Sequence, residues 1–258
     1  MAGMTCAQTI GAPVLNLVAE TSSLGGLSLP MTAPLPRMAP ELALQVFTER
    51  SSVQAASLAG YQDQTTVEAV LPDTRQKGEY ELLRTYTADP RSLSYRSIRY
   101  TGDGFVKTNV IIKLLQSEVH NVDKGNPSDT ALTERNYKFS YKGTEMVNGN
   151  LTHVFQVKPR HKKPGLFKGK IFVDAYTGSL RRMEGTLAKS PSFFVRKVEF
   201  VQDFTDVDGF TVPTILRSTA KARIIGRAIV TILHKAYEVK TISGANAADG
   251  LRASTAAN

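Results

Sequence analysis

The sequence predicts a mainly β protein built on one large antiparallel sheet. Between Asn136 and Tyr237, short segments of alternating apolar and polar residues follow one another. Turn-forming sequences separate them about every ten residues. Tight turns make neighbouring segments pair in space, which favours an up-and-down sheet over a parallel nucleotide-binding one. The turn sequences are Asn148-Gly149-Asn150, Tyr176-Thr177-Gly178, Ser190-Pro191 and Asp208-Gly209.

Seven strands are expected in this block, and two of them show clearly which face is dry. Around Phe200, valine and phenylalanine alternate with charged residues such as Lys197, Glu199 and Asp203. The next strand alternates apolar and small residues with Arg217 and Lys221. Such strands are half-buried in antiparallel sheets. The expected segments are 136–147, 151–159, 166–175, 179–188, 192–204, 209–222 and 226–239.

A helix and three strands are expected before this block. Residues 1–39 lack periodicity and predict a flexible leader, and residues 243–258 a flexible tail. Pro40 suits the first turn of a helix over Glu41–Leu58. Its expected apolar stripe is Leu42, Val46, Val53 and Leu58. Three alternating segments predict strands over Tyr61–Leu71, Gly78–Ala88 and Ser92–Tyr100.

The strongest helical pattern in the chain runs from Val110 to Val122. Its apolar residues fall at helical spacing, which predicts a helix that covers the neighbouring sheet. The expected apolar face is Val110, Ile111, Leu114, Leu115, Val119 and Val122, and the expected polar face is Lys113, Gln116 and Glu118.

Composition favours a globular protein with anionic partners. The 258 residues are 41% hydrophobic and carry a net charge of +9, which suits nucleic acid, acidic lipid headgroups or acidic polymers. No apolar run has the roughly 18 residues that a membrane-spanning helix needs. The one cysteine, Cys6, excludes an intrachain disulfide. A trimmed signal peptide that ends near Cys6, with or without lipidation, stays open.

The residue patterns predict no catalytic, metal or cofactor site. The four histidines are scattered, and the chain has no HExxH, GxSxG or P-loop motif. Asp203, Asp206 and Asp208 do not match the register of a calcium loop, so they predict a polar hairpin turn. The phenylalanines share a face with valine and alanine, opposite the lysines. This arrangement disfavours a nucleic-acid platform, where aromatic and basic residues interleave.

A sheet of about ten strands is wider than one or two short helices can cover. The uncovered part favours an apolar hollow of the kind that holds lipids. A fully packed core is the other interpretation, and periodicity alone does not choose between them. Ser218, Ala220 and Ala222 are small residues that would leave room for a ligand.

Residues 40–240 resemble the LolA-like outer-membrane lipoprotein-sorting proteins of bacteria. The resemblance lies in the segments HVFQVKPR, GKIFVDAYTGSLRRMEG, SPSFFVRKVEFVQDF and VDGFTVP, and in the order of the preceding helices and strands. It implies an unclosed β half-barrel over residues 40–242 with helices as a lid, located in the periplasm. Such a protein would be a non-enzymatic carrier of lipoprotein acyl chains or other lipids toward the outer membrane. Its partners would be lipoproteins, lipids or membrane transfer proteins; an envelope-stress sensor of the same fold is the alternative.

Two groups of residues follow from this interpretation. The expected ligand-binding residues are Phe139, Phe155, Val157, Phe194, Val198, Phe200, Val212, Leu216, Ala220, Val110, Ile111, Leu114 and Leu115. A basic hairpin tip would contact phosphate headgroups or an anionic membrane surface, or else be a solvated tip, through Lys158, Arg160, Lys162, Lys163 and Lys168. Phe167 beside it is a candidate for insertion into that surface.

Overall fold

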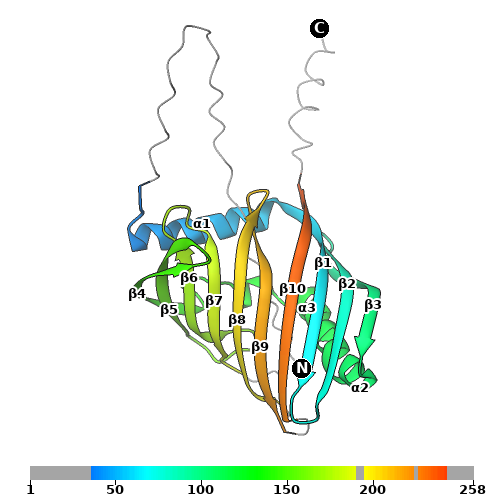
Figure 1. The fold of residues 1–258 in the computed structure, drawn as a ribbon. Helices are drawn as coiled ribbons and strands as arrows, with labels where there is room; N and C mark the ends of the chain where they lie inside the picture. Colours follow the sequence, from blue (N-terminus) through cyan, green and yellow to red (C-terminus); the bar gives the residue numbers. More distant parts are fainter. Residues whose placement is uncertain (1–35, 190–194, 224–225, 243–258) are drawn as a thin grey trace, which may run out of the picture.

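Ten antiparallel strands form one curled sheet with two free edges (Figure 1). The computed structural model describes residues 36–189, 195–223 and 226–242. Across the sheet the strands lie in the order β3-β2-β1-β10-β9-β8-β7-β6-β5-β4. The strands are β1 (Leu58–Leu71), β2 (Gln76–Ala88), β3 (Arg91–Gly102), β4 (Tyr137–Val147), β5 (Asn150–Pro159), β6 (Phe167–Asp174), β7 (Leu180–Leu187), β8 (Val195–Val207), β9 (Phe210–Ala222) and β10 (Gly226–Thr241).

The seven strands from β4 to β10 confirm the predicted block. Each pairs with its sequence neighbour, as tight turns require. Asn148 and Gly149 both have positive φ angles, 48° and 82°, and so do Asp208 and Gly209, 51° and 80°. Two such residues in a row form the turn that best matches the twist of a hairpin. The Ser190-Pro191 turn lies outside the described residues.

The sheet departs from a simple up-and-down order at one place. β1 pairs with β10, so that Val67 lies opposite Ile232 and Ala69 opposite Val230. The strands β3 and β4, although consecutive in sequence, form the two edges of the sheet. This is possible because the segment between them is a long helical crossover rather than a hairpin turn.

The helix α1 (Pro40–Ser57) lies across one end of the sheet (Figure 1). It meets the turns of two hairpins there: the Gln54 amide donates to the Gly209 carbonyl oxygen at 2.7 Å. The predicted apolar stripe was wrong, since Leu42 and Val53 are 47% and 40% exposed. The buried side chains are Ala43, Phe47 and Gln54. A helix that rests on strand ends buries only a narrow line of residues, here one small, one aromatic and one polar side chain.

The second helical segment covers the face of the sheet near β1–β3. It consists of α2 (Gly104–Val106), the π-helical turn η1 (Lys107–Ile111) and α3 (Ile112–Lys124), so it begins earlier than predicted. Val110, Ile111 and Leu115 are buried against the sheet, as expected. Glu118 was wrongly placed on the polar face, because its side chain is only 13% exposed and points to the sheet. A short 3-10 helix, η2 (Pro127–Asp129), follows.

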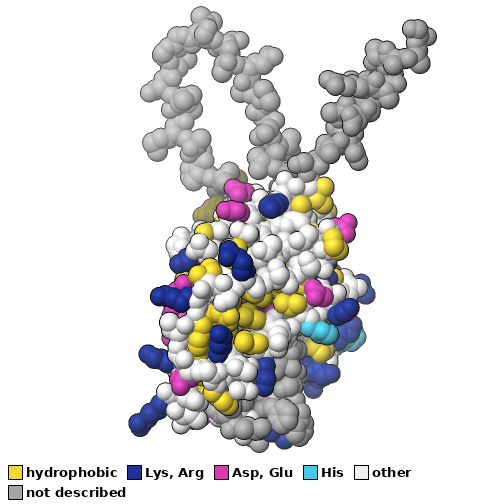
Figure 2. Space-filling view, turned by 90° about the vertical axis from the view of Figure 1, so that its right-hand side faces the viewer, with side chains coloured by type: hydrophobic (Ala, Val, Ile, Leu, Met, Phe, Trp, Pro, Cys, Tyr) yellow, Lys and Arg dark blue, Asp and Glu magenta, His cyan; other side chains and the backbone are white. Residues whose placement is uncertain are grey.

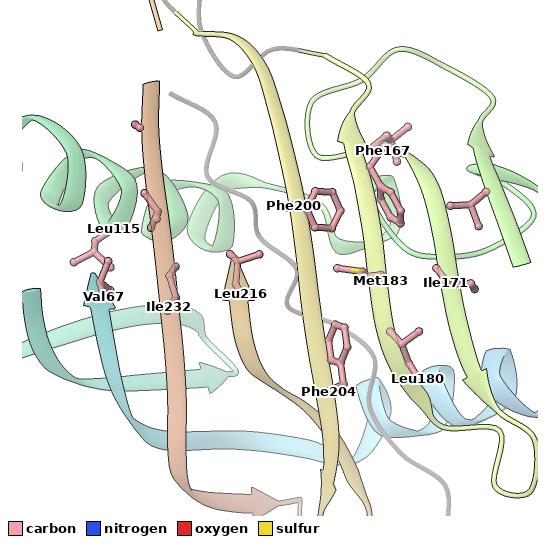
Figure 3. Close-up of a cluster of buried hydrophobic side chains, with 14 of the residues drawn as sticks. Val67, Leu115, Phe167, Ile171, Leu180, Met183, Phe200, Phe204, Leu216 and Ile232 are labelled. Atoms are coloured by element: carbon pink, nitrogen blue, oxygen red, sulfur yellow. The ribbon is translucent and has the colours of Figure 1, made fainter. Parts of the chain in front are cut away.

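The main core lies between the helices and the sheet face that they cover, here called the inner face. Side chains from β1, β6–β10 and α3 meet there (Figure 3). Gly169 and Gly185 lie opposite each other on β6 and β7. A Cβ atom at Gly169 would overlap the Glu184 carbonyl oxygen of the next strand. These glycines let the two backbones approach closely, and such positions bend a sheet.

The side of the molecule formed by β3 and α2 is partly apolar. Hydrophobic side chains gather there among lysines and arginines (Figure 2). Ile98 on β3 and Phe105 on α2 are 53% and 43% exposed. In the described part of the chain, no helix combines the length and the apolar character needed to cross a membrane.

Candidate functional site

The register of the strands brings several predicted ligand-binding residues into adjoining rows on the inner face. Phe200 on β8 lies opposite Ser218 on β9 and Gly185 on β7. Ser218 in turn lies opposite Val230. One step along the strands, Ala220 lies between Val198 and Ala228. The rows alternate large apolar side chains with glycine, alanine and serine.

Exposure differs along the inner face. Next to α1 and under α3 the apolar side chains are almost fully buried, with Val67 at 0% and Leu180 at 1%. Ser218 and Ala220, near the other end of the strands, are half-buried although they also face inward. Ser218 and Ala220 are therefore local half-buried positions on β9, because Leu71 and Phe167, which lie toward the same end, are 0% and 4% exposed.

Gln202 is a polar residue on this apolar face. It lies opposite Met183 and Leu216, which both belong to the main core (Figure 3). The residue is 4% exposed, and its Oε1 atom has no hydrogen-bond partner among the residues that the structure describes. A buried amide oxygen without a partner is rare in proteins because desolvation is not compensated. Gln54 Oε1 on α1 shares this state, but Gln202 is the one of the two that lies among the apolar side chains of the inner face.

The structure brings most of the predicted ligand-binding residues together. Phe139, Leu114 and Ala220 are half-buried at the margin of the inner face. Val212 is buried in a different cluster, with Leu58, Tyr86 and Phe210 near α1. Phe194 lies outside the described residues. The remaining ones are buried in the interior: Phe155, Val157, Val198, Phe200, Leu216, Val110, Ile111 and Leu115.

The predicted basic residues lie on or beside the exposed hairpin between β5 and β6. Lys158, Arg160, Lys162, Lys163 and Lys168 are all exposed. The suggestion that Phe167 inserts into a membrane was wrong. Phe167 is 4% exposed, and its ring packs edge-on against Phe200 at 5.1 Å between centroids.

A buried charged network, which the sequence analysis missed, links four strands to α3. The Arg84 guanidinium donates to Asp63 Oδ2 at 2.7 Å and to the Tyr237 hydroxyl at 2.8 Å. Its other nitrogen lies 3.6 Å from Glu118 on α3. The Tyr95 hydroxyl donates to Glu118 at 2.7 Å. The sequence did hold a sign of this network. Asp63 and Arg84 occupy inward positions of β1 and β2, where the alternating pattern otherwise places mainly apolar residues.

Burial and Arg84 set the ionisation of this network. Burial, aided by the positive charge of Arg84, lowers the pKa of His234 to about 4, so its imidazole is neutral at pH 7. Its Nδ1 lies 3.2 Å from Asp63 Oδ1. For Asp63, burial alone would raise the pKa, but the His234 hydrogen bond and Arg84 outweigh it and lower the pKa. Burial raises the pKa of Glu118.

No group of three or more histidine, cysteine, aspartate or glutamate residues in the described ranges is arranged to hold a metal ion. Two of the three aspartates around the β8–β9 turn form ion pairs with arginine side chains. Asp203 accepts from Arg182 at 2.6 Å, and Asp206 lies 3.2 Å from Arg181. Asp203 has the outward parity that was expected, but it is 5% exposed because its carboxylate lies against Arg182 and Arg217, the latter at 3.7 Å.

Comparison with known proteins adds a family of unknown function and a set of solved structures. Residues 128–239 match the family DUF5686, whose function is unknown. No curated protein matches the chain.

The matching structures include LolA-like proteins. One is a putative outer-membrane lipoprotein-sorting protein domain from Vibrio parahaemolyticus, with 11% identity, coverage of 78% of this chain and 93% of the other, and a TM-score of 0.40. Another is a LolA superfamily protein from Nitrosomonas europaea, with 10% identity, 71% and 87% coverage and a TM-score of 0.35. The MucA/MucB complex of Pseudomonas aeruginosa matches with 13% identity, 70% and 88% coverage and a TM-score of 0.23. The likeness concerns the fold and says nothing about the ligand.

Proposed function

We propose that this protein binds acyl chains of lipoproteins or other lipids on its inner face and carries them through the periplasm toward the outer membrane. The observation that carries the proposal is the buried Gln202 amide with its unpartnered oxygen on an apolar face. An acyl chain supplies the apolar contacts, and the amide or hydroxyl group next to it supplies a donor for Gln202. Each buried methylene contributes about 0.8 kcal/mol.

The half-buried small residues support the same proposal. Ser218 and Ala220 lie between larger side chains on three adjacent strands. A chain laid along this row contacts Phe200, Val198 and Val230 without displacing the strands. The fully buried part of the inner face admits a longer chain only if α3 moves outward.

The test replaces Ser218 with a side chain that fills the row. Ser218→Phe is expected to lose at least about tenfold in affinity for a dansyl-labelled undecanoic acid, the equivalent of about two methylenes. Thr219→Phe, its neighbour on the outer face, is the matched control and is expected to bind like the unmodified protein. Fluorescence titration measures both, and circular dichroism checks that each folds.

Equal affinity of Ser218→Phe and the unmodified protein would overturn the choice of site. A lack of any bound amphiphile in organic extracts of protein purified from its own host, together with no uptake of the labelled acid, would overturn acyl binding itself.

A second function, sensing through a protein partner, is favoured by the free edge at β3. An edge strand offers unpaired backbone groups to another strand. Beside it, Ile98 and Phe105 add exposed apolar area. Co-purification separates the two functions, since a carrier brings lipid or lipoprotein and a sensor brings one protein in a fixed ratio.

A further inference from the structure

One end of the sheet collects positive charge. The turns after β6 and β8 meet α1, as the bonds of Ala175 with Met38 and of Gly209 with Gln54 show. In an antiparallel sheet the hairpins β1–β2, β5–β6 and β9–β10 therefore lie at the opposite end, here called the rim (Figure 1). The half-buried residues Ser218 and Ala220 lie toward the rim.

Three lysines stand side by side on the outer face near the rim. Lys138 on β4 lies directly opposite Lys158 on β5. On the other side of β5, Val157 pairs with Gly169 of β6. In this antiparallel register Lys168 lies next to Lys158. All three are exposed, and within the described residues none forms an ion pair. Like charges directly opposite one another destabilise a sheet. This set is called the lysine ladder.

A second set of cations repeats the arrangement on three other strands. Lys197 on β8 lies opposite Lys221 on β9, and Lys221 lies opposite Arg227 on β10. Lys197 and Lys221 are exposed, and Arg227 is one residue into its strand, at the rim. Lys197 is paired with the exposed Glu199 at 2.6 Å. Two groups of like charges are thus each aligned across three strands, and Glu199 offsets part of the charge of the second group.

The β5–β6 hairpin extends the lysine ladder beyond the strand ends. The hairpin is held in place, because Arg160 donates through Nε to the Glu134 carbonyl oxygen at 2.6 Å. Lys162 and Lys163 project from it into solvent, and Lys163 lies 3.4 Å from the exposed Asp129. Leu166 beneath them is 1% exposed. The hairpin therefore presents lysine side chains and Pro164 to solvent, while Leu166 and Phe167 are buried.

The types of side chain at the rim favour some classes of binding partner over others. Protein interfaces favour arginine and aromatic residues and are depleted in lysine. Single-stranded nucleic acid needs exposed aromatic rings for stacking. The lysine ladder, the second set of cations and the hairpin are mainly lysine, and their named members include no aromatic residue. An anionic lipid surface requires only a spread of positive charge, since each lysine or arginine near it contributes about 1 kcal/mol.

We propose that the rim, through the lysine ladder, the β5–β6 hairpin and the second set of cations, docks this protein on an anionic phospholipid surface. The end of the inner face that carries the half-buried residues Ser218 and Ala220 then faces the bilayer, and α1 faces away from it. This proposal deepens the proposed function, because an acyl chain passes between bilayer and inner face at that end, but docking itself needs no bound chain.

The experiment measures sedimentation with phosphatidylcholine vesicles that contain or lack phosphatidylglycerol. We expect binding only to the anionic vesicles, with an affinity that falls steeply as salt is added. The triple variant Lys138→Gln/Lys158→Gln/Lys168→Gln is expected to lose about a hundredfold in affinity. It is also expected to melt at the same or a higher temperature, because like-charge repulsion is removed.

The matched control removes the same charge elsewhere. The triple variant Lys142→Gln/Lys235→Gln/Lys240→Gln changes three exposed lysines away from the rim and is expected to stay within about threefold of the unmodified protein. Equal loss in both triple variants, or equal binding to both kinds of vesicle, would overturn the proposal. The proposal would also be overturned if the vesicles do not bind and an acidic protein binds instead, in a way that requires the lysine ladder.

Failure of this proposal is distinguishable from failure of acyl binding. The lysine-ladder variant is expected to take up the dansyl-labelled acid normally, and Ser218→Phe is expected to sediment normally with anionic vesicles. Vesicle binding that depends on Ser218 instead of the ladder would contradict docking through the rim.

Discussion

At the scale of single residues, Arg84 organises the interior next to β1, β2 and β10. Its guanidinium is buried with Asp63, and the ring of Tyr61 lies 5.0 Å from it. Burial raises the pKa of Tyr61 to about 12, so this ring stays neutral and serves as an aromatic face. Buried ion pairs add little net stability, but the loss of one partner is costly. The network therefore fixes the relative positions of its elements more than it adds stability.

His234 predicts a specific dependence of stability on pH. Its pKa is about 4 in the folded protein, against an ordinary value of 6.5 for a histidine in the unfolded chain. The unfolded chain therefore binds the proton first, and this contribution to the free energy of unfolding is complete above pH 6.5. It falls as the pH decreases toward 4, by about 3 kcal/mol in total. Urea unfolding at several pH values measures the decline.

His234→Gln supplies the comparison. Glutamine does not titrate, so the decline between pH 6.5 and 4 is expected to flatten. The lowered pKa of Asp63 leaves a further loss at more acidic pH, while Glu118, whose pKa is raised, works in the opposite direction. An unchanged slope in the His234→Gln variant would show that His234 is not buried neutral.

At the scale of elements, the paired glycines of β6 and β7 predict where the sheet is sensitive. Gly169→Ala places a methyl group against the Glu184 carbonyl oxygen and is expected to destabilise the protein by about 2 kcal/mol or more. Gly104→Ala in α2 meets no atom within 4 Å and is expected to be neutral or slightly stabilising. Thermal unfolding compares them, and equal melting temperatures would refute the close approach of β6 and β7.

The strands could be predicted because alternation and turn chemistry are local. The turns at Asn148-Gly149 and Asp208-Gly209 each specify a hairpin from adjacent residues. The pairing of β1 with β10 joins residues such as Val67 and Ile232, and no local pattern encodes it. The stripe of α1 was misjudged because it was placed on Leu42 and Val53 and left out Phe47, which is the large side chain that the helix buries.

The candidate site was predictable only in part for a related reason. Phe200 and Leu216 lie on strands whose alternation is regular, so their inward direction could be inferred. Gln202 also lies at an inward position of its strand. Its proposed role, however, depends on the unpartnered amide oxygen, which the sequence pattern does not show. Glu118 faces inward because Arg84 and Tyr95 are there to meet it. A charged residue can therefore be buried when a strand that is distant in sequence supplies its partner.

At the scale of the whole molecule, Glu118 connects the helical cover to the sheet. Glu118→Gln removes the charge that faces Arg84 and is expected to loosen α3. Hydrogen exchange in residues 104–124 is expected to become faster by about tenfold, as the loss of about 1–2 kcal/mol in a charged contact implies. His120→Gln, an exposed change on the same helix, is the control. Unchanged exchange in Glu118→Gln would mean that packing alone holds α3.

The adjacency of β1 and β10 has a consequence for how the chain is made. A ribosome releases β1–β3 long before the strand that must lie beside them exists, and the interval spans nearly the whole length of the sheet. Until then the early hairpins have an unsatisfied flank, and the later strands can assemble among themselves. β10 lies between β1–β3 and β4–β9, so it joins these two parts of the sheet when it is made. A chain that ends before β10 leaves the two parts unconnected.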